Sequence, residues 1–294
     1  MDVSEPTAGV AVAAADFGLK GPRGWAFRSV GFEAEPGSLI AIEGPSGSGR
    51  TCLLLALTGR MKPSEGRATV GPHGLPKGMS AVRRISALAY VPGVTDLDPA
   101  LTVGEHLRER ALLESRFGDS LRTLLRPRSE RAVETESRID TALAAAGLDL
   151  AALPKGSRTA VRDLERLETL RLSVALAMVG RPRLLAVDDT DLKLSAADRA
   201  AAWDLLRSLT QAGTTVIAVC SQAPEDAVVV STAPMSTARA SAARASAARL
   251  STAPADDAHD DDVEEDDAEH DDVKHDDVED DKETADALAE AGRA

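Results

Sequence analysis

The sequence has no long hydrophobic run and very little cysteine. No stretch of about 18 apolar residues occurs, so the chain is not predicted to cross a bilayer by itself. Residues 1–17 lack a cationic start followed by an apolar stretch, and no secretory signal is recognisable there. Two cysteines, Cys52 and Cys220, are too few for a disulfide framework. These absences favour a cytoplasmic protein.

The negative charge is confined to the end of the chain. There are 48 acidic and 34 basic residues, a net charge of −14, and residues 231–294 carry the entire excess. We expect a globular domain over residues 8–230, an Ala/Ser-rich linker over 231–255 and a disordered acidic tail over 256–294, because the last two segments have too little apolar surface to offset the entropy of ordering. The globular part is electrically balanced and lacks a basic stripe, so no nucleic-acid partner is expected.

Short apolar runs alternate with helical patterns in the globular part. Four runs read as buried strands: Leu39–Ile42, Ala87–Val91, Leu184–Val187 and Val216–Cys220. Helices are predicted over Cys52–Leu57, Thr102–Leu113, Ser129–Gly147, Val161–Met178 and Ser195–Gly213. This alternation predicts an α/β fold with a parallel sheet wrapped by helices. Ahead of it, Val10–Leu19 and Trp25–Ala34 predict an antiparallel pair, which a plain doubly wound fold lacks.

A glycine-rich loop stands between the first buried strand and its helix. Residues 44–51, Gly-Pro-Ser-Gly-Ser-Gly-Arg-Thr, match the phosphate-loop pattern Gly-x4-Gly-Lys-Thr except that arginine replaces lysine. Such glycines let successive backbone N–H groups point inward and form an anion site at a helix N-terminus. The alternative is an ordinary glycine-rich turn. The candidate cofactor-binding residues are Gly44, Pro45, Ser46, Gly47, Ser48, Gly49, Arg50, Thr51 and Cys52.

Two residues of this loop have further expected roles. The Thr51 hydroxyl is expected to bind Mg²⁺. Arg50 keeps the positive charge of lysine on a longer, planar and forked group. Because binding tolerates such a change better than a transition state does, we predict retained ATP binding with weakened hydrolysis.

Four segments resemble the ATP-binding subunit of an ATP-binding cassette (ABC) transporter. They are the phosphate loop, Leu101–Leu107, Val174–Leu185 and Asp188-Asp189. The resemblance covers about residues 8–230 and implies a P-loop NTPase fold of ABC type, with an N-terminal antiparallel β-subdomain and a helical subdomain at about 102–170. It also implies ATP and Mg²⁺ as ligands, a dimer of nucleotide-binding domains with itself or a second subunit, and a membrane-embedded permease partner that would bring the chain to the inner face of the membrane.

The resemblance assigns Asp188 to Mg²⁺, and it places Asp189 where the family has the glutamate that polarises the attacking water. Asp189 is one methylene shorter than that glutamate, and a misplacement of about 1 Å can reduce a rate about 100-fold. The alternative interpretation is that the two aspartates simply end a strand.

Several other family positions are occupied by different residues. The signature motif falls on Leu164–Glu168, where Glu165 is negative, no glycine is present, and a helix start is the better description. Gly93 replaces a glutamine, and Ser221 replaces a histidine that contacts the γ-phosphate. Ser195 replaces an aspartate and is predicted to cap a helix instead. A site that lacks these positioning groups is expected to bind nucleotide better than it hydrolyses it.

Adenine usually stacks on a flat side chain, but the sequence has only four Phe, two Trp and one Tyr. Trp25 is the first stacking candidate, followed by Phe17, and either one is equally compatible with the core of the β-subdomain.

Three functions remain open from the sequence. The first is an ABC-type ATPase with slow turnover that drives or gates a membrane transporter. The second is a nucleotide-binding regulatory module without significant turnover. The third is another P-loop enzyme, such as a small-molecule kinase or a GTPase, which the spacing from Leu101 to Asp189 disfavours.

Overall fold

The computed structural model describes residues 9–117, 128–191 and 194–233 of the chain. The expected acidic tail and all but the first three residues of the expected linker lie outside the described residues. Within the described part, no helix has the length and apolar content needed to cross a membrane.

The first sheet is the antiparallel β-subdomain. Strands β1 (Val12–Gly21) and β2 (Gly24–Ala34) pair in antiparallel fashion, as the sequence predicts, and the sheet has the order β2-β1-β4-β5. The strands β4 (Glu65–Val70) and β5 (His73–Leu75) were not expected from the sequence. Both follow helix α1 in the chain and return to the first sheet, so they belong to the β-subdomain only through tertiary pairing.

The second sheet is parallel and has the order β6-β7-β8-β3-β9. Its strands are β3 (Leu39–Glu43), β6 (Ser86–Leu88), β7 (Leu184–Val187), β8 (Thr215–Val219) and β9 (Val228–Ser231). The carboxyl ends of parallel strands lie at one edge of a sheet, and ligand sites of open α/β folds lie outside that edge. Strand β9 was not predicted, and it carries the pairing with β3 on to Ser231.

Alternating side chains of β3 belong to two hydrophobic cores. Leu39 and Ala41 join the core that contains α6 (Arg166–Met178) and α7 (Ala196–Gln211). Ile40 and Ile42 join the core that contains α1 (Arg50–Leu57) and the first sheet. Because successive residues of a strand face opposite sides, one buried strand joins both layers and fixes the position of the loop that follows it.

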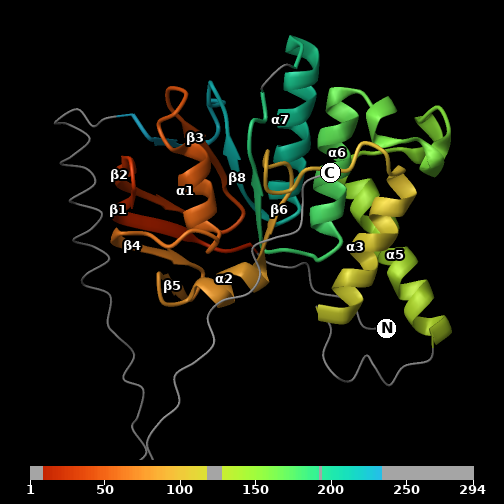
Figure 1. The fold of residues 1–294 in the computed structure, drawn as a ribbon, viewed down its shortest axis with the longest axis horizontal. Coiled ribbons are helices and arrows are strands. Elements are labelled where there is room, and N and C mark those ends of the chain that lie inside the picture. The colour runs from red at the N-terminus through yellow and green to blue at the C-terminus, as the bar shows by residue number, and fades with distance from the viewer. Residues whose placement is uncertain (1–8, 118–127, 192–193, 234–294) are drawn as a thin grey trace, which may run out of the picture. The chain divides into compact units, whose positions relative to one another are not determined.

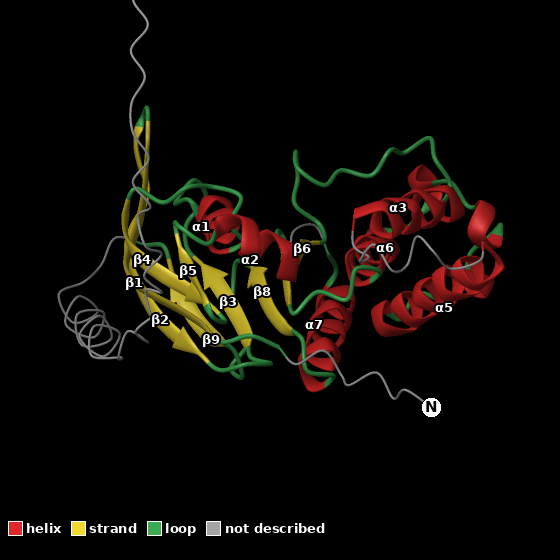
Figure 2. Cartoon of the chain, turned by 90° about the horizontal axis from the view of Figure 1, so that it is seen from below, coloured by secondary structure: helices red, strands yellow, loops and turns green. Residues whose placement is uncertain are grey.

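The helices divide into two groups. Figures 1 and 2 show α1 and α2 (Met79–Ile85) beside the strands, and α3 (Val103–Phe117) and α5 (Arg128–Ala146) in a separate group with α6. Helix α6 links that group to the parallel sheet, because it packs against α3, α5, α7 and β6. The helical subdomain expected near residues 102–170 corresponds to this group. Short 3₁₀ turns at Leu150–Ala152, Gly156–Arg158 and Val161–Asp163 connect α5 to α6.

Several predicted boundaries differ from the observed ones. Ser129 lies inside α5, which includes Arg128, so Ser129 is not the cap that the sequence suggested. The helix expected from Val161 begins only at Arg166, because Val161 lies in a 3₁₀ turn and Leu164 ends it. Both residues still pack into or against the first core, so their apolar spacing reflects burial and not a continuous helix. Ser195 caps α7 as predicted, since its Oγ accepts a bond from the Asp198 N–H at 3.1 Å.

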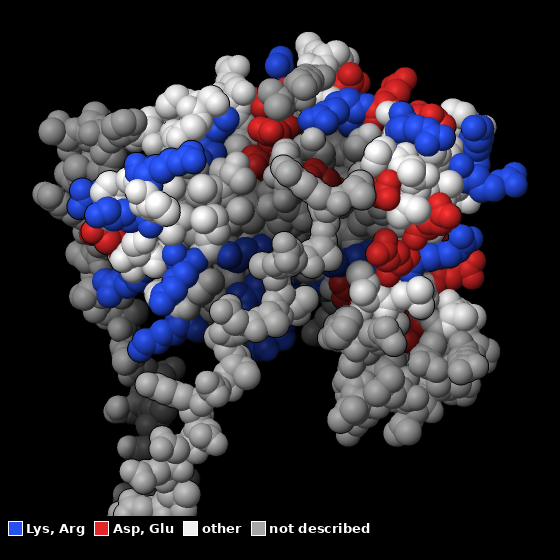
Figure 3. All heavy atoms as spheres, in the orientation of Figure 1, with Lys and Arg blue, Asp and Glu red and all other residues white. Residues whose placement is uncertain are grey.

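Charge is unevenly distributed over the surface. On the face shown in Figure 3, Lys and Arg side chains gather over the side of the molecule that holds β4, β5 and α2, whereas both signs mix over the helical group. The exposed basic residues of the first of these regions are Lys62, Arg67, Lys77, Arg83 and Arg84. The balance of charge over the whole globular part therefore conceals a local positive excess.

Candidate functional site

The phosphate loop depends on glycines in the left-handed region of backbone conformation. Gly47 and Gly49 have φ values of 79° and 81°, which residues with a side chain rarely adopt. A Cβ at Gly49 would collide with the carbonyl oxygen of Ala26, whereas a Cβ at Gly47 would meet no atom within 4 Å. The loop is therefore pressed against β2 at Gly49 and open at Gly47.

The loop also contacts the segment that follows β9. The Ser48 Oγ lies 2.5 Å from the Oγ1 of Thr232, and the Thr232 N–H donates to the Glu43 carbonyl at 3.0 Å. Thr232 thus connects the end of β9 to the loop, although the sequence gives no local sign of this role.

Helix α1 begins at Arg50, directly after the loop, with Gly49 as its N-cap residue. The first N–H groups of a helix have no partner within the helix, and the helix dipole is positive at this end. Among the residues that the structure describes, no side chain caps α1. The loop and this helix start have the chemistry of an anion site.

Thr51 and Asp188 meet beneath the loop. The Thr51 Oγ1 donates to the Asp188 Oδ2 at 2.6 Å, which joins the start of α1 to the end of β7. A hydroxyl and a carboxylate are ligands that Mg²⁺ accepts. The buried position and the close pairing of these two oxygens fit the metal that phosphate loops use.

Burial is the main influence on the pKa of the Asp188 carboxyl. Burial raises its pKa, the Thr51 hydroxyl lowers it, and the negative charge of Asp189 raises it again. The Asp189 N–H donates to the Asp188 Oδ1 at 2.9 Å, which lowers this pKa. The positive charge of Arg50 lowers it as well. The net effect is a raised pKa, so a cation beside this carboxyl would relieve a real electrostatic cost.

Arg50 reaches the end of β8, the strand that pairs with β3. Its Nη1 donates to the Cys220 carbonyl at 2.9 Å. The next N–H, that of Ser221, donates to the Asp191 Oδ2 at 2.8 Å, and the Ser221 hydroxyl lies 3.4 Å from Oδ1 of the same carboxyl. The Cys220–Ser221 peptide therefore joins the phosphate-loop arginine to an acidic residue that the sequence analysis did not consider. The sequence does show a third acidic residue in the run Asp188-Asp189-Thr190-Asp191, but nothing in its spacing separates Asp191 from an ordinary loop residue.

Asp189 lies toward the helical group. It has a φ of 47°, an uncommon value for a residue with a side chain, and it lines a small cavity together with Tyr90 and Arg166. Arg166, from the segment where the family signature falls, stacks its guanidinium 4.8 Å from the centre of the Tyr90 ring and donates to its hydroxyl at 3.0 Å. Glu165 and Glu168 form a capping box at the start of α6, as fits the predicted helix start.

Gly93 occupies the position where the resemblance expects a glutamine. Its φ is 76°, and its N–H donates to Asp96 Oδ2 at 2.9 Å in an exposed turn. A Cβ built there would meet no atom within 4 Å, so the turn has room for a side chain that glycine does not supply.

Trp25 lies next to the part of β2 that touches the loop. It precedes Ala26, is 37% exposed, and has the Arg28 guanidinium 4.6 Å from its ring centre. Phe17 is fully buried and packs on Phe27 at a ring distance of 5.8 Å. Of the two stacking candidates, only Trp25 offers a surface that a base can reach.

Cys52 is half-buried against the second core, one residue beyond Thr51. Burial raises the pKa of its thiol, with a further contribution from the charge of Asp188. Its side chain has the environment of a packed residue in α1.

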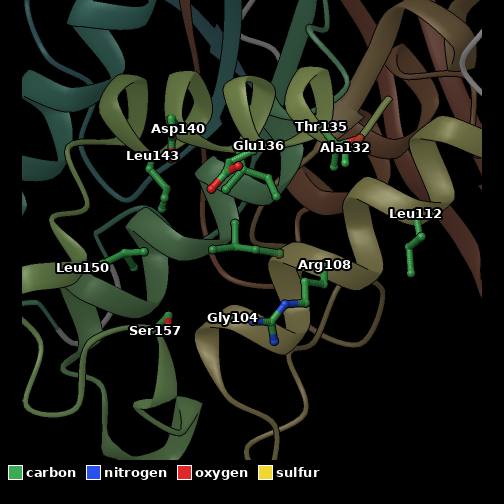
Figure 4. Close-up of a pocket in the computed structure, with 12 residues that line it drawn as sticks. Gly104, Arg108, Leu112, Ala132, Thr135, Glu136, Asp140, Leu143, Leu150 and Ser157 are labelled. Atoms are coloured by element: carbon green, nitrogen blue, oxygen red, sulfur yellow. The ribbon is translucent and has the colours of Figure 1, made fainter. Parts of the chain in front are cut away.

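A separate hollow of about 700 Å³ lies in the helical group between α3 and α5. Figure 4 shows Arg108 and Leu112 on α3, at one side of the hollow, and Glu136 and Leu143 on α5, at the other. Leu112, which lines the hollow, is 65% exposed, and Val133 on α5, which is outside its lining, is 69% exposed, so apolar surface extends beyond the hollow on the α5 side.

Comparison with known proteins agrees with this architecture. The sequence profile of the family described as "ABC transporter" matches residues 27–191. The chain belongs to the ABC transporter family. The match begins in β2 and ends at Asp191, so it includes the phosphate loop and the Thr51–Asp188 pair.

Curated relatives of this ABC protein include ATP-binding subunits and larger transporters. It is 29% identical over 185 residues to the Nod factor export ATP-binding protein I of Cupriavidus metallidurans, a match that covers 63% of this chain and 54% of the relative. It is 32% identical to ABC transporter G family member 11 of Arabidopsis thaliana, a match that covers 64% of this chain and 25% of that relative. The chain therefore spans about half the length of the first of these relatives and a quarter of the second.

Solved structures share the fold. The cbiO1 protein of Clostridium perfringens, part of an ABC transporter complex, superposes with a TM-score of 0.57 at 18% identity, covering 72% of this chain and 78% of that one. A dimeric ATP-binding cassette with ADP and phosphate bound gives a TM-score of 0.55 at 20% identity, covering 72% and 88%. The fold is the P-loop NTPase fold of ABC type, as expected.

Proposed function

We propose that this ABC protein binds ATP·Mg²⁺ at Gly44–Thr51 and hydrolyses it slowly to drive or gate a separate membrane transporter. The observation that carries the proposal is the Thr51–Asp188 hydrogen bond of 2.6 Å beside a loop of left-handed glycines and a helix N-terminus. Together these groups supply amide donors for phosphates and two oxygens for a metal. Mg²⁺ held by Thr51 and Asp188 would neutralise charge on the outer phosphates when bound.

The chain's own groups would then orient the nucleotide. Loop amides and Arg50 bind the phosphates, and Trp25 offers one face to the base. In this proposal Asp189 takes the role of the glutamate that polarises the attacking water, and it performs this role poorly because its side chain is one methylene shorter. Slow hydrolysis follows, because phosphoryl transfer depends on positioning and electrostatics.

The partner in this proposal is a membrane-embedded permease subunit, bound from the cytoplasmic side. The hollow between α3 and α5 suits a short amphipathic segment of such a partner, since Leu112 and Leu143 offer apolar contact and Arg108 and Glu136 offer charges of both signs. A dimer of nucleotide-binding domains, with itself or a second subunit, belongs to the same proposal.

A regulatory module that binds nucleotide without significant turnover is the second candidate. It is favoured by Gly93, where a side chain has room but none is present, and by Ser221, whose N–H and hydroxyl are both directed to Asp191. Steady-state phosphate release with and without a membrane partner separates the two candidates.

The proposal is tested by magnesium-dependent binding of ATP to the purified full chain. Thr51→Val keeps the shape of the side chain but removes the hydroxyl, so we expect it to abolish the gain in affinity that Mg²⁺ gives. Thr210→Val is the matched control, because the one hydrogen bond described for the Thr210 side chain is to the Arg207 carbonyl on α7. Binding that is equal with Mg²⁺ and with EDTA in the unaltered protein contradicts the proposal.

A further inference from the structure

The position of Arg50 bears on which nucleotide the loop prefers. Lysine at this point of a phosphate loop reaches the β- and γ-phosphates. Arginine is longer, and here its Nη1 is already hydrogen-bonded to the Cys220 carbonyl, 2.9 Å away at the end of β8. The guanidinium of Arg50 therefore lies farther from the backbone of the loop than the ammonium group of a lysine would. A guanidinium has five N–H donors, so this bond leaves it able to bind a phosphate as well.

The acceptor that holds Arg50 is itself held from its other edge. The Cys220 carbonyl and the Ser221 N–H belong to one peptide unit, and that N–H donates to Asp191 at 2.8 Å. A carboxylate that accepts from a peptide N–H polarises the peptide and strengthens its carbonyl as an acceptor. Asp191 is therefore a positioning residue for Arg50, although the two side chains contact opposite edges of the peptide.

The surroundings of the outermost phosphate are acidic. In a phosphate loop this phosphate lies between the residue at the Arg50 position and the metal held by the loop threonine. Asp188 is on the metal side, and Asp191 is beyond the Cys220–Ser221 peptide. Burial is the main reason that the pKa of the Cys220 thiol is raised to about 12. The negative charges of Asp191 and Glu43 contribute to the rise, and the positive charge of Arg50 opposes it. The carboxylates of Asp188 and Asp191 thus both lie near the residues that a third phosphate would approach.

We infer that the loop binds a nucleoside diphosphate more tightly than the corresponding triphosphate, because the anchored Arg50 guanidinium takes the place of the outermost phosphate. The inference rests on the proposed function, since it concerns the same site. A diphosphate leaves the Arg50–Cys220 bond intact and receives the remaining guanidinium donors on its β-phosphate. A triphosphate must displace that bond and bring further negative charge toward Asp191. Retention of the diphosphate after hydrolysis also accounts for slow turnover.

The experiment measures dissociation constants of the full chain for ADP and for the β,γ-imido analogue of ATP, both with Mg²⁺, by calorimetry. We expect ADP to bind about tenfold more tightly, the effect of one unfavourable charge contact at a half-buried site. Arg50→Lys removes the anchor and is expected to shift the ratio toward the triphosphate by about tenfold. Asp191→Asn is expected to shift it in the same direction by a smaller factor.

A double-mutant cycle separates this role of Asp191 from a merely structural one. Asp191→Asn should change the ratio when Arg50 is present and leave it unchanged in the Arg50→Lys background, because the lysine is not anchored at Cys220. Asp204→Asn, an exposed change on α7, is the control and should leave the ratio as it is.

The results that overturn the inference are distinct from those that overturn the proposed function. A triphosphate bound as tightly as ADP, or more tightly, refutes the inference while nucleotide binding stands. An equal effect of Asp191→Asn in both backgrounds refutes the anchoring role. Failure of both nucleotides to bind refutes the proposed function together with the inference. If Arg50→Lys does not fold, the ADP-to-triphosphate ratio of the unaltered protein and of Asp191→Asn still decides the question.

Discussion

Two glycines of the phosphate loop allow one substitution to be compared in two surroundings. Gly47 and Gly49 have φ values of 79° and 81°, so alanine has nearly the same backbone strain at either position. They differ in their neighbours. A Cβ at Gly47 meets open space, whereas a Cβ at Gly49 meets the carbonyl group and backbone of Ala26, with its carbon at 2.6 Å. The difference between the two variants isolates the contact between the loop and β2.

The expected magnitudes follow from these surroundings. A left-handed backbone costs a residue with a side chain about 1–2 kcal/mol. Alanine offsets about 0.4–1 kcal/mol of this cost, because it lowers the conformational entropy of the unfolded chain relative to glycine. Gly47→Ala should therefore lower the free energy of unfolding by about 1 kcal/mol. Gly49→Ala adds the displacement of backbone in a packed region, about 1–3 kcal/mol more.

Thermal unfolding of the two variants measures this difference. In a domain of this size about 1 kcal/mol corresponds to roughly 2–4 °C in Tm, so we expect a loss of about 2–4 °C for Gly47→Ala and about 4–16 °C for Gly49→Ala. ATP affinity is measured on the same samples, and Gly49→Ala should lose more of it because the loop must move off β2. Equal losses of Tm in the two variants would refute the reasoning that Gly49 is needed for close packing.

Three further predictions concern groups outside the loop. Thr215→Val should lower the free energy of unfolding by about 2–4 kcal/mol in urea titrations, since the buried hydroxyl accepts from two backbone N–H groups and donates to one carbonyl, and Thr215→Ser should restore most of the loss. Cys220, whose pKa burial raises to about 12, should react with iodoacetamide at pH 8 on the order of 10³-fold more slowly in the folded protein than after unfolding, as followed by mass spectrometry. Arg207 donates two hydrogen bonds to the Asp226 carboxylate and thereby lowers its pKa. This pair should therefore stabilise the fold above about pH 4 and lose its effect as pH falls through the lowered pKa. Arg207→Met should accordingly reduce stability at pH 7 and have little effect at pH 2, and an equal loss at both values would contradict the pairing.

The elements with a local signal were predictable from the sequence. The fully apolar run Leu184–Val187 is a buried parallel strand, and Ser195 caps a helix through its own hydroxyl. Both depend on residues within a few positions of each other, where periodicity and capping chemistry are sufficient. The ABC type of the fold followed from the order and spacing of four such segments and is confirmed by the family match.

The parts that were missed depend on contacts between distant segments. Strands β4, β5 and β9 are short, and their pairing partners lie elsewhere in the chain, so no local pattern separates them from loops. Val161 and Leu164 were assigned to a helix because 3₁₀ turns can bury residues at a spacing that resembles α-helical periodicity.

For the site, the sequence named the loop residues and Asp188 but not the groups around them. Asp191 bonds to Ser221 across two strand ends, and Thr232 bonds to Ser48 only because β9 runs beside β3. Contacts of this kind arise from tertiary packing, which one sequence does not reveal. The roles of Trp25, Arg50, Thr51, Asp188 and Asp189 toward nucleotide remain predictions for the experiments above.

The pairing of β3 has a consequence for the newborn chain. This strand leaves the ribosome early, yet both of its neighbours in the sheet, β8 and β9, are translated near the end of the described residues. Until they emerge, a strand with four consecutive apolar residues, Leu39–Ile42, is left with two open edges, a state prone to mispairing with other polypeptides. The contact of Thr232 with Ser48 of the loop therefore cannot form until translation has passed Ser231, and a messenger truncated before Val228 should yield a product that aggregates or is degraded.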